Sequence, residues 1–322
     1  MTKEQQKQME LAEAALEKQY GAGVIQNLGN KVNKPIPSIP TNLPSLDKYV
    51  LGCGGFPRGR IIEIFGPESS GKTTIALHLI GQCQKMGGVA TFVDAEHALS
   101  PTHAHNMGVN MDDLIVSQPD YGEQALEVVE ALVDYKASDL IVVDSVTALV
   151  PKAEIDGEMG DSHMGLQARL MSQAMRKLCG KAATNGILIV FINQIREKVG
   201  LVFGNPEVTT GGRALKFYSS VRLEVRKVSG PEGAIKDDKG LIIGHRMKIK
   251  GAKNKVGNPF RETIVDLEYE SGFDMNADLI EYAIKIGVVQ KAGAWCSFDG
   301  QKYRQDDLVD VFDKIKAAMG AV

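Results

Sequence analysis

The stretch GPESSGKT, at positions 66–73, determines the fold class of this chain. It matches the pattern G-x-x-x-x-G-K-[ST], in which glycines let backbone N–H groups close around phosphate oxygens. The stretch lies between an apolar, strand-like run at Arg60–Phe65 and a helix-like run at Thr73–Gln84. The strand before it and the helix after it favour a nucleotide site over a chance glycine-rich turn by roughly twenty to one.

Two side chains of this loop carry the chemistry of phosphate binding. Lys72 places a compact cation against the outer phosphates, and the Thr73 hydroxyl is a ligand suited to Mg²⁺. The helix that begins there adds the positive end of its dipole. We therefore expect a nucleoside triphosphate as the ligand.

Further apolar runs extend the alternation of strands and helices, at Val89–Val93, Leu140–Val143 and Ile187–Ile192. Their apolarity is continuous rather than alternating, which is typical of a parallel sheet covered by helices on both faces. In such sheets, ligands bind beyond the carboxyl ends of the strands. We therefore predict that the residues following four strands converge on one polar site.

The residues that follow these strands suit the hydrolysis of a nucleotide. Asp144 ends an apolar strand, the usual position of a carboxylate near the Mg²⁺ of a P-loop site. Glu96 is the best candidate to orient or deprotonate the attacking water, against about one chance in four of a structural salt bridge. Gln194 can donate and accept hydrogen bonds, so it could sense the terminal phosphate and pass that state to the segment after it.

Composition and charge limit the classes of protein to consider. The 322 residues, 43% of them hydrophobic, suffice for one large domain with appendages. No apolar run approaches the length of a membrane span, and the charged N-terminus is unlike a signal peptide, so we expect a cytoplasmic protein without membrane contact. The four widely spaced cysteines suggest neither a disulfide framework nor a zinc site. His97, His103 and His105 do not have the spacing of a known zinc site, so we expect structural or surface roles for them.

The net charge of −3 means that any nucleic-acid surface must come from local clusters of cations. Seven Lys or Arg residues stand between Lys239 and Arg261, with no acid among them. This segment could bind nucleic acid, or it could face the nucleotide of a neighbouring subunit and stabilise the transferred charge in trans. The spacing leaves both alternatives open.

The N-terminal segment reads as a helix followed by a linker. The helix is predicted at about Lys3–Tyr20, and Gly21 and Gly23 provide a stop. Prolines at positions 35, 37, 40 and 44 make the connector extended, which would let the helix dock on a neighbouring subunit. These residues alone support packing on the chain's own core equally well.

Two glycine-rich segments leave the same region of the predicted sheet, at Glu154–Gly165 and Val199–Gly212. The second is too polar and flexible for a core element, and long loops of this kind are usually functional. Between them, a helix predicted at Leu166–Cys179 presents a polar stripe made of Arg169, Gln173 and Arg176. Arginines beside such loops suit phosphate contacts, although the stripe by itself would indicate only a solvated helix face.

A set of longer blocks stands along the chain in a fixed order: GPESSGKTT at 66–74, DAEHAL at 94–99, IVVDSV at 141–146, GDSHMGLQARLMSQAMRKL at 160–178, FINQIR at 191–196, FGNPE at 203–207, TTGGRALKFY at 209–218 and KNK at 253–255. With these blocks, the sequence resembles the bacterial RecA recombinase family from about Ala14 to Phe298. The GDSHMGL and FINQIR blocks are far more specific than the P-loop, which many unrelated enzymes share.

The resemblance implies an ATP-dependent strand-exchange protein that polymerises on single-stranded DNA and pairs it with homologous double-stranded DNA. ATP, with Mg²⁺ as cofactor, would lie between the subunits of a helical homo-oligomeric filament. The resemblance further implies a part in DNA repair and the SOS response, with a LexA-like repressor as an additional partner.

The family pattern also assigns roles to residues. Catalysis would depend on Lys72, Glu96 and Gln194, and on the neighbour-facing lysines Lys253 and Lys255. Nucleotide contacts would come from Gly66, Pro67, Glu68, Ser69, Ser70, Gly71, Lys72, Thr73, Thr74, Ser100, His103, Asp144 and Tyr269, with Thr73 and Asp144 at the metal. The loops at 154–165 and 195–212 would line the DNA axis, with contacts from Met164, Arg169, Arg176, Arg196, Val199, Gly211, Gly212 and Arg213. The N-terminal helix would dock on the adjacent subunit, and Phe217 would lie at the interface.

Three features depart from the family pattern. Ser100 and His103 stand where Asp and Tyr usually surround the adenine, and imidazole stacks with less area than phenol. Arg213 replaces a usual Asn and predicts tighter, more salt-sensitive DNA binding. The sequence ends at Val322 after a predicted helix at Asp306–Met319, without a long acidic tail, so we expect weaker self-inhibition and readier duplex binding.

The predicted fold class is α/β, a RecA-type P-loop ATPase core whose mainly parallel twisted sheet is flanked by helices, with an N-terminal helix and a small α+β C-terminal domain. The expected boundaries are 1–37 for the oligomerisation helix and linker, 38–270 for the core and 271–322 for the small domain. Two other classes remain to be compared. A P-loop small-molecule kinase would turn over without DNA, and a non-catalytic filament protein would lack the chemistry of Glu96.

Overall fold

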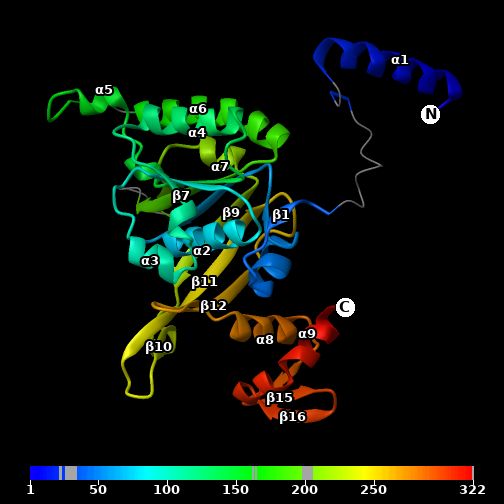
Figure 1. The fold of residues 1–322 in the computed structure, drawn as a ribbon, viewed down its shortest axis with the longest axis vertical. Helices are drawn as coiled ribbons and strands as arrows, with labels where there is room; N and C mark the ends of the chain where they lie inside the picture. The colour runs from blue at the N-terminus through cyan, green and yellow to red at the C-terminus, as the bar shows by residue number, and fades with distance from the viewer. Residues whose placement is uncertain (22–23, 26–34, 162, 164, 198–205, 321–322) are drawn as a thin grey trace. The chain divides into compact units, whose positions relative to one another are not determined.

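The computed structural model describes residues 1–21, 24–25, 35–161, 163, 165–197 and 206–320 (Figure 1). Within them, the chain forms two compact units, Met1–Ile36 and Pro37–Val322. The predicted DNA contacts Met164 and Val199 lie outside the described residues. No helix in the described ranges has both the length and the apolarity needed to cross a membrane.

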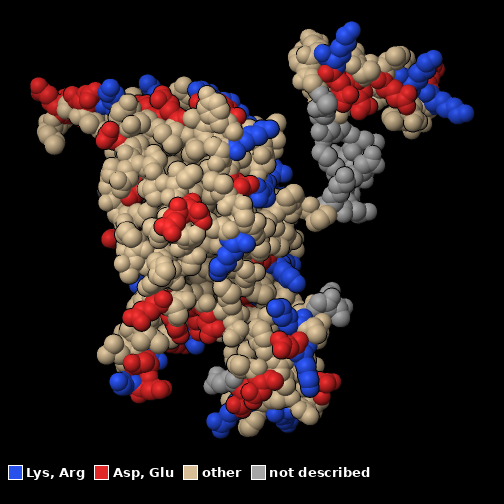
Figure 2. All heavy atoms as spheres, viewed as in Figure 1, with Lys and Arg blue, Asp and Glu red and all other residues tan. Residues whose placement is uncertain are grey.

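The first unit contains helix α1, Lys3–Tyr20, as the sequence predicts. Thr2 begins it with a capping box, because its hydroxyl accepts from the Gln5 N–H while the Gln5 side chain accepts from the Thr2 N–H. Lys and Glu side chains are interspersed along the helix (Figure 2). The described residues leave its apolar side chains Met9 and Leu11 exposed.

One large sheet organises the second unit. Its parallel strands are β3 (Ile61–Gly66), β4 (Ala90–Asp94), β5 (Ile115–Ser117), β6 (Leu140–Asp144), β7 (Leu188–Glu197) and β9 (Val221–Lys227). Antiparallel pairing adds β8 (Glu207–Thr209), β10 (Ala234–Lys236), β11 (Ile242–Asn254), β12 (Glu262–Glu268) and β13 (Gly272–Phe273). Through the described residues, the order is β13-β12-β11-β9-β3-β7-β6-β4-β5, with β10 on β11 and β8 on β7.

Helices cover both faces of this sheet, because alternate residues of each buried strand point to opposite sides. Ile62 and Ile64 of β3 pack in the same core as helix α2 (Lys72–Lys85). Ile61 of β3 joins the opposite core, formed with helices α4 (Gly122–Asp134), α6 (Leu166–Asn185) and α7 (Ala214–Tyr218). This layered arrangement confirms the predicted fold class.

Short elements complete this unit. Strands β1 (Ser38–Ile39) and β2 (Phe56–Pro57) form a small antiparallel pair, and a π-helical segment at Ser45–Leu51 lies between them in sequence. Helix α3 (Pro101–Asn106) follows β4, and the short helix α5 (Lys152–Ile155) follows β6. The hairpin of β10 and β11 projects from the sheet (Figure 1).

The C-terminal part combines helix α8 (Met275–Lys285) with a three-stranded antiparallel sheet and helix α9 (Phe312–Gly320). The strands are β14 (Gln290–Ala292), β15 (Trp295–Phe298) and β16 (Gln301–Arg304). These elements have a core of their own, which includes Leu279, Cys296 and Ile315. The α8 carboxylate Asp278 accepts hydrogen bonds from the backbone and hydroxyl of Ser45, which ties this part to the π-helical segment.

The structure differs from the sequence predictions in three elements. The helix that begins at Leu166 ends at Asn185 rather than Cys179, and the one expected at Asp306–Met319 is a 3₁₀ segment, Asp306–Val311, followed by α9. Strand β7 does not stop at Ile192 but continues to Glu197, where it forms a hairpin with β8. Part of the segment expected to be too polar and flexible for a core element is therefore a short strand, in which Thr209 pairs with Ile195 and no residue is buried.

Candidate nucleotide and DNA site

The P-loop joins β3 to α2 and needs glycine at two positions. Gly66 packs closely against strand β9, since a Cβ atom there would lie 2.0 Å from the carbonyl oxygen of Val225. Gly71 has a φ of +93°, and a Cβ atom there would lie 2.2 Å from the Met247 methyl group. Glycine at these two positions therefore lets the loop take a close-packed conformation that a side chain would prevent, and such glycine-rich loops can turn backbone N–H groups toward a phosphate.

A cavity of about 420 Å³ opens beside this loop. One wall is formed by the end of the P-loop and the start of α2, with Ser69, Ser70, Gly71, Lys72, Thr73 and Thr74. The hydroxyl of Ser70 is buried and has no hydrogen-bond partner among the described residues. A buried polar atom without a partner is costly, so this hydroxyl fits the contact surface of a polar ligand such as a phosphate.

Lys72, Thr73 and Asp144 make the polar base of the site. The Lys72 Nζ donates to the carbonyl oxygen of Pro67 at 2.7 Å, and the Thr73 hydroxyl donates to the Asp144 carboxylate at 2.6 Å. Burial raises the pKa of Asp144 to about 6, and the nearby charge of Glu96 adds to the increase. Burial also lowers the pKa of Lys72, against the opposing pull of Asp144.

Glu96 is held by two donors from neighbouring strand ends. The Gln194 Nε2 donates to the Glu96 Oε1 at 3.2 Å, and the Ser145 hydroxyl donates to the same oxygen. The parallel register explains this meeting, because Gly66 pairs with Gln194 and Asp94 pairs with Asp144 at one edge of the sheet. The P-loop, the carboxylate and the amide therefore face one site.

The other end of the cavity carries aromatic and imidazole rings. His103 lies on α3, and its Nε2 is 3.2 Å from the Thr74 hydroxyl oxygen. Tyr269 and His245 also line the cavity, with ring centroids 5.8 Å apart. Ser100 is not among the lining residues, since its hydroxyl accepts from the His103 N–H at the start of α3.

One wall of this cavity was not predicted from the sequence; it is formed by Lys227, His245, Leu267 and Glu268. His245 is only 8% exposed, and both of its ring nitrogens are buried without a hydrogen-bond partner in the described ranges. Burial and the charge of Lys227 lower the pKa of His245. The sequence does carry a signal for His245. It is a polar residue in the alternating strand at 242–254, at a position facing inward, where such a strand normally has apolar residues.

The predicted DNA-contacting residues that are described lie on α6, near the end of β7 and in the segment before α7. Arg169 and Arg176 are exposed on that helix, and Arg196 is exposed near the end of β7. Gly211 and Gly212 have φ values of +76° and +77°. Cβ atoms there would lie 2.7 Å from side-chain atoms of Val146 and Ala168, so glycine permits the close packing of this segment on α6.

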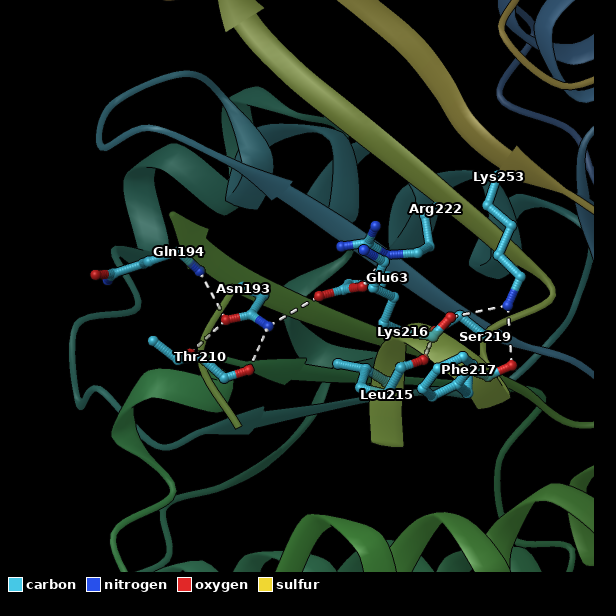
Figure 3. A network of polar contacts seen from close by, with 10 residues as sticks. All are labelled: Glu63, Asn193, Gln194, Thr210, Leu215, Lys216, Phe217, Ser219, Arg222 and Lys253. Atoms are coloured by element: carbon cyan, nitrogen blue, oxygen red, sulfur yellow. Dashed lines mark hydrogen bonds and ion pairs between the residues drawn. The ribbon is translucent and has the colours of Figure 1, made fainter. Parts of the chain in front are cut away.

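A second cavity, of about 790 Å³, lies beside the β7–β8 hairpin. Phe65, Ile195, Arg213, Lys216, Phe217 and Arg222 are among its lining residues. Phe217 is 65% exposed in spite of its large ring. The Lys253 Nζ donates to the carbonyl oxygens of Lys216 and Phe217 at 2.8 and 2.9 Å (Figure 3).

The basic run at 239–261 is partly neutralised by acids that lie outside it in the sequence. Arg246 pairs with Asp266 at 3.2 Å and Lys248 pairs with Glu262 at 2.8 Å across β11 and β12. On the face seen in Figure 2, cations are interspersed with acids. Arg246 and Lys248 therefore have acidic partners on the neighbouring strand. Of the two KNK lysines, Lys255 is exposed.

Comparison with known proteins agrees with this geometry. A family model described as the RecA N-terminal domain matches residues 7–274. The RecA protein of Geobacter sulfurreducens is 56% identical over 306 residues, which cover 95% of this chain and 89% of the relative. Those of Caldanaerobacter subterraneus and Desulforapulum autotrophicum are 54% and 51% identical over 94% and 98% of this chain, and 86% and 91% of the relatives.

The similarity spans the P-loop, the strand-end residues and both glycine-rich segments, and the sheet order brings these parts together. The chain therefore belongs to the RecA family, the DNA-dependent ATPases that form filaments on single-stranded DNA and catalyse strand exchange in recombination and repair.

Proposed function

We propose that ATP binds in the 420 Å³ cavity with its phosphates in the P-loop, and that Glu96 activates the water that attacks the terminal phosphate. The observation that carries this proposal is the hydrogen bond from Gln194 to Glu96 beside Lys72 and Thr73. It joins the carboxylate that we propose as the base to strand β7, which leads into the proposed DNA-binding segment. Lys72 would leave the Pro67 carbonyl and contact the outer phosphates.

The residues at the base of the site fit Mg²⁺. Thr73 and Asp144 supply a hydroxyl and a carboxylate oxygen 2.6 Å apart, and Mg²⁺ in nucleotide sites takes one or two such ligands together with phosphate oxygens and water. When bound, Mg²⁺ neutralises charge that develops on the phosphate oxygens. Both carboxylates act in their ionised form: Asp144 to hold the metal ion, and Glu96 to take a proton from water.

The base of the nucleotide lies, in this proposal, at the end of the cavity with His103 and Tyr269. Their rings offer stacking surface, and the Thr74 hydroxyl positions the His103 ring by a contact of 3.2 Å. Ser100 acts through α3, whose first turn it caps.

Single-stranded DNA follows the exposed arginines of α6 and the segments that flank it. Arg169, Arg176, Arg196 and Arg213 would contact phosphates, and the segment that contains Gly211 and Gly212 would contact the DNA backbone beside them. Met164 and Val199 complete the proposed interface by separating bases, although both lie outside the described residues. Homologous duplex DNA is the second substrate of strand exchange.

The filament contact completes the site in trans. We assign this contact to Phe217, to residues 1–37, and to Lys253 and Lys255, which reach the ATP of the neighbouring subunit. Residues 38–270 then form the ATPase core and 271–322 a small accessory domain. A LexA-like repressor is the further partner that we propose for the filament.

Mixing two inactive variants tests the trans arrangement. Lys72→Ala lacks the phosphate contact but presents Lys255 to its neighbour, and Lys255→Ala has the opposite defect. If sites form between subunits, an equimolar mixture regains about a quarter of the wild-type, single-stranded-DNA-dependent ATP turnover, since random order restores one junction in four. Turnover in the mixture no higher than in either variant alone would refute sharing of the site.

A further inference from the structure

Asn193 lies at the centre of a buried polar network (Figure 3). The residue is 0% exposed. Its Oδ1 accepts from the Gln194 N–H at 2.9 Å and from the Thr210 hydroxyl at 2.5 Å. Its Nδ2 donates to Glu63 at 2.9 Å and to the Thr210 carbonyl at 3.1 Å. The amide thus uses both donors and two acceptor positions, so it has no spare hydrogen bond with which to adapt.

Glu63 and Arg222 anchor one side of this network. Glu63 is 0% exposed, and its second carboxylate oxygen forms an ion pair with Arg222. The Arg222 guanidinium lies 4.2 Å from the Phe65 ring centroid and lines the second cavity. Removing either charge would leave the other buried and uncompensated, so this pair fixes the position of the Asn193 Nδ2.

The other side of the network approaches the Glu96 carboxylate by two routes. Gln194, whose N–H binds Asn193, donates through its side chain to Glu96 at 3.2 Å. The Thr210 hydroxyl oxygen lies 3.0 Å from that of Thr147, and Ser145, two positions earlier, donates to the same oxygen of Glu96. Thr210 therefore belongs to a closed circuit that approaches Glu96 through β7 and through the end of β6.

We propose that Asn193 and Thr210 are positioning residues, which transmit the position of the segment Glu207–Gly212 to Gln194 and Glu96. This inference rests on the proposed function, which assigns DNA contacts to the end of that segment and catalysis to Glu96. DNA that shifts the segment along α6 displaces Thr210. The Asn193 amide has no free hydrogen-bonding capacity, so it can keep its bond to a displaced Thr210 only by turning or by releasing the Gln194 N–H. Either event moves Gln194 and so changes the orientation of Glu96.

Removal of the Thr210 hydroxyl tests this link. Thr210→Val keeps the shape of the side chain but loses both hydroxyl contacts, whereas Thr210→Ser keeps the hydroxyl and serves as the matched control. We expect Thr210→Val to lower the ratio of ATP turnover with and without single-stranded DNA by at least about fivefold. Thr210→Ser should stay within about twofold of wild type, and single-stranded DNA binding in the presence of a non-hydrolysable ATP analogue should be unchanged in both variants.

Thr147→Val provides a second route to the same measurement, should Thr210→Val fail to fold. Adding Gln194→Ala to either valine variant should lower the ratio no further than Gln194→Ala does alone, because residues of one circuit are not additive. Wild-type stimulation in both valine variants, or fully additive losses, would overturn the circuit and leave the proposed site intact. Absence of stimulation in the wild-type protein would instead contradict the proposed function itself.

Discussion

Gln194 and Glu96, 98 positions apart in the sequence, are joined by a hydrogen bond of 3.2 Å between Nε2 and Oε1. The bond passes over the end of β6, where Ser145 donates to the same carboxylate oxygen. Glu96 is therefore oriented by residues of two other strand ends. Such preorganisation of a catalytic group reduces the reorganisation that the reaction requires.

The titration of Asp144 predicts how nucleotide binding depends on pH. Burial raises its pKa from 3.8 to about 6, and an ionised carboxylate is needed to hold Mg²⁺. The affinity for ATP in the presence of Mg²⁺ should accordingly be constant from pH 8 to about 6.5 and decline by up to about tenfold per pH unit below 6. Calorimetric titration across pH 5–8 measures this, and a constant affinity down to pH 5 would contradict the assignment.

The same carboxylate affects stability in the opposite direction. Since its pKa is raised on folding, the folded state binds the proton more tightly, so stability is lost as pH rises from 3.8 through about 6 and is constant above. Asp144→Asn should therefore raise the melting temperature of the nucleotide-free protein at pH 8 by clearly more than at pH 5, where only part of this loss has occurred. Equal effects at both pH values would show that the charge of Asp144 is not the cause.

His245 is expected to contact the nucleotide through its ring nitrogens, which are buried in the cavity wall without partners in the described ranges. His245→Phe keeps the ring beside Tyr269 and removes both nitrogens. Loss of one such buried contact should raise the Kd for ATP by about 5- to 10-fold. Tyr269→Phe, which also keeps its ring, is the matched control. A Kd for the His245 variant equal to that of wild type would exclude the contact.

Gly71 should tolerate no side chain. Alanine there would have to adopt a φ of +93°, which costs on the order of 1–3 kcal/mol in the free energy of unfolding, and it would also displace the flexible Met247 methyl group 2.2 Å away. Gly71→Ala should also abolish measurable ATP binding, because the loop must shift. Gly180→Ala, an exposed helical position with nothing within 4 Å, should change stability by no more than about 1 kcal/mol, in the stabilising direction. Similar melting temperatures for both variants would refute the steric argument.

Arg213 should increase the salt dependence of DNA binding. It is exposed and lines the cavity beside the β7–β8 hairpin. Arg213→Asn should reduce the slope of log affinity for single-stranded DNA against log salt concentration by about 0.7, the effect of one phosphate contact. Lys314→Gln on α9 should leave the slope unchanged. Parallel salt plots for wild type and Arg213→Asn would show that Arg213 touches no phosphate.

The sequence predicts the parallel half of the sheet well, because continuous apolar runs such as Leu140–Val143 allow few alternatives. It also locates the P-loop and the strand-end residues Asp144 and Glu96, since these follow buried strands directly. The antiparallel extension through β11 and β12 was not predicted. Its strands alternate in polarity, and their order depends on pairings between residues far apart in the chain, such as Lys253 with Arg222.

The same limitation explains which site residues were missed. His245 enters the cavity only because β11 crosses beside the P-loop, a contact that local spacing does not encode. Glu63 carried a usable signal, since an acid inside a buried run such as Ile61–Phe65 requires a charged or polar partner. Its partners Asn193 and Arg222 come from two other strands, 130 and 159 positions away. Only the strand order identifies them.

The most direct test of the account is the rate of ATP hydrolysis by wild type and Glu96→Gln, each with and without single-stranded DNA, beside a binding titration on the same DNA. We expect DNA to stimulate the wild type strongly. Glu96→Gln should bind DNA with ATP as tightly as wild type but hydrolyse ATP at least about 100-fold more slowly, as for a lost general base. Hydrolysis by Glu96→Gln at the wild-type rate, or wild-type hydrolysis that DNA does not change, would contradict the central claim that a DNA-linked Glu96 performs the reaction.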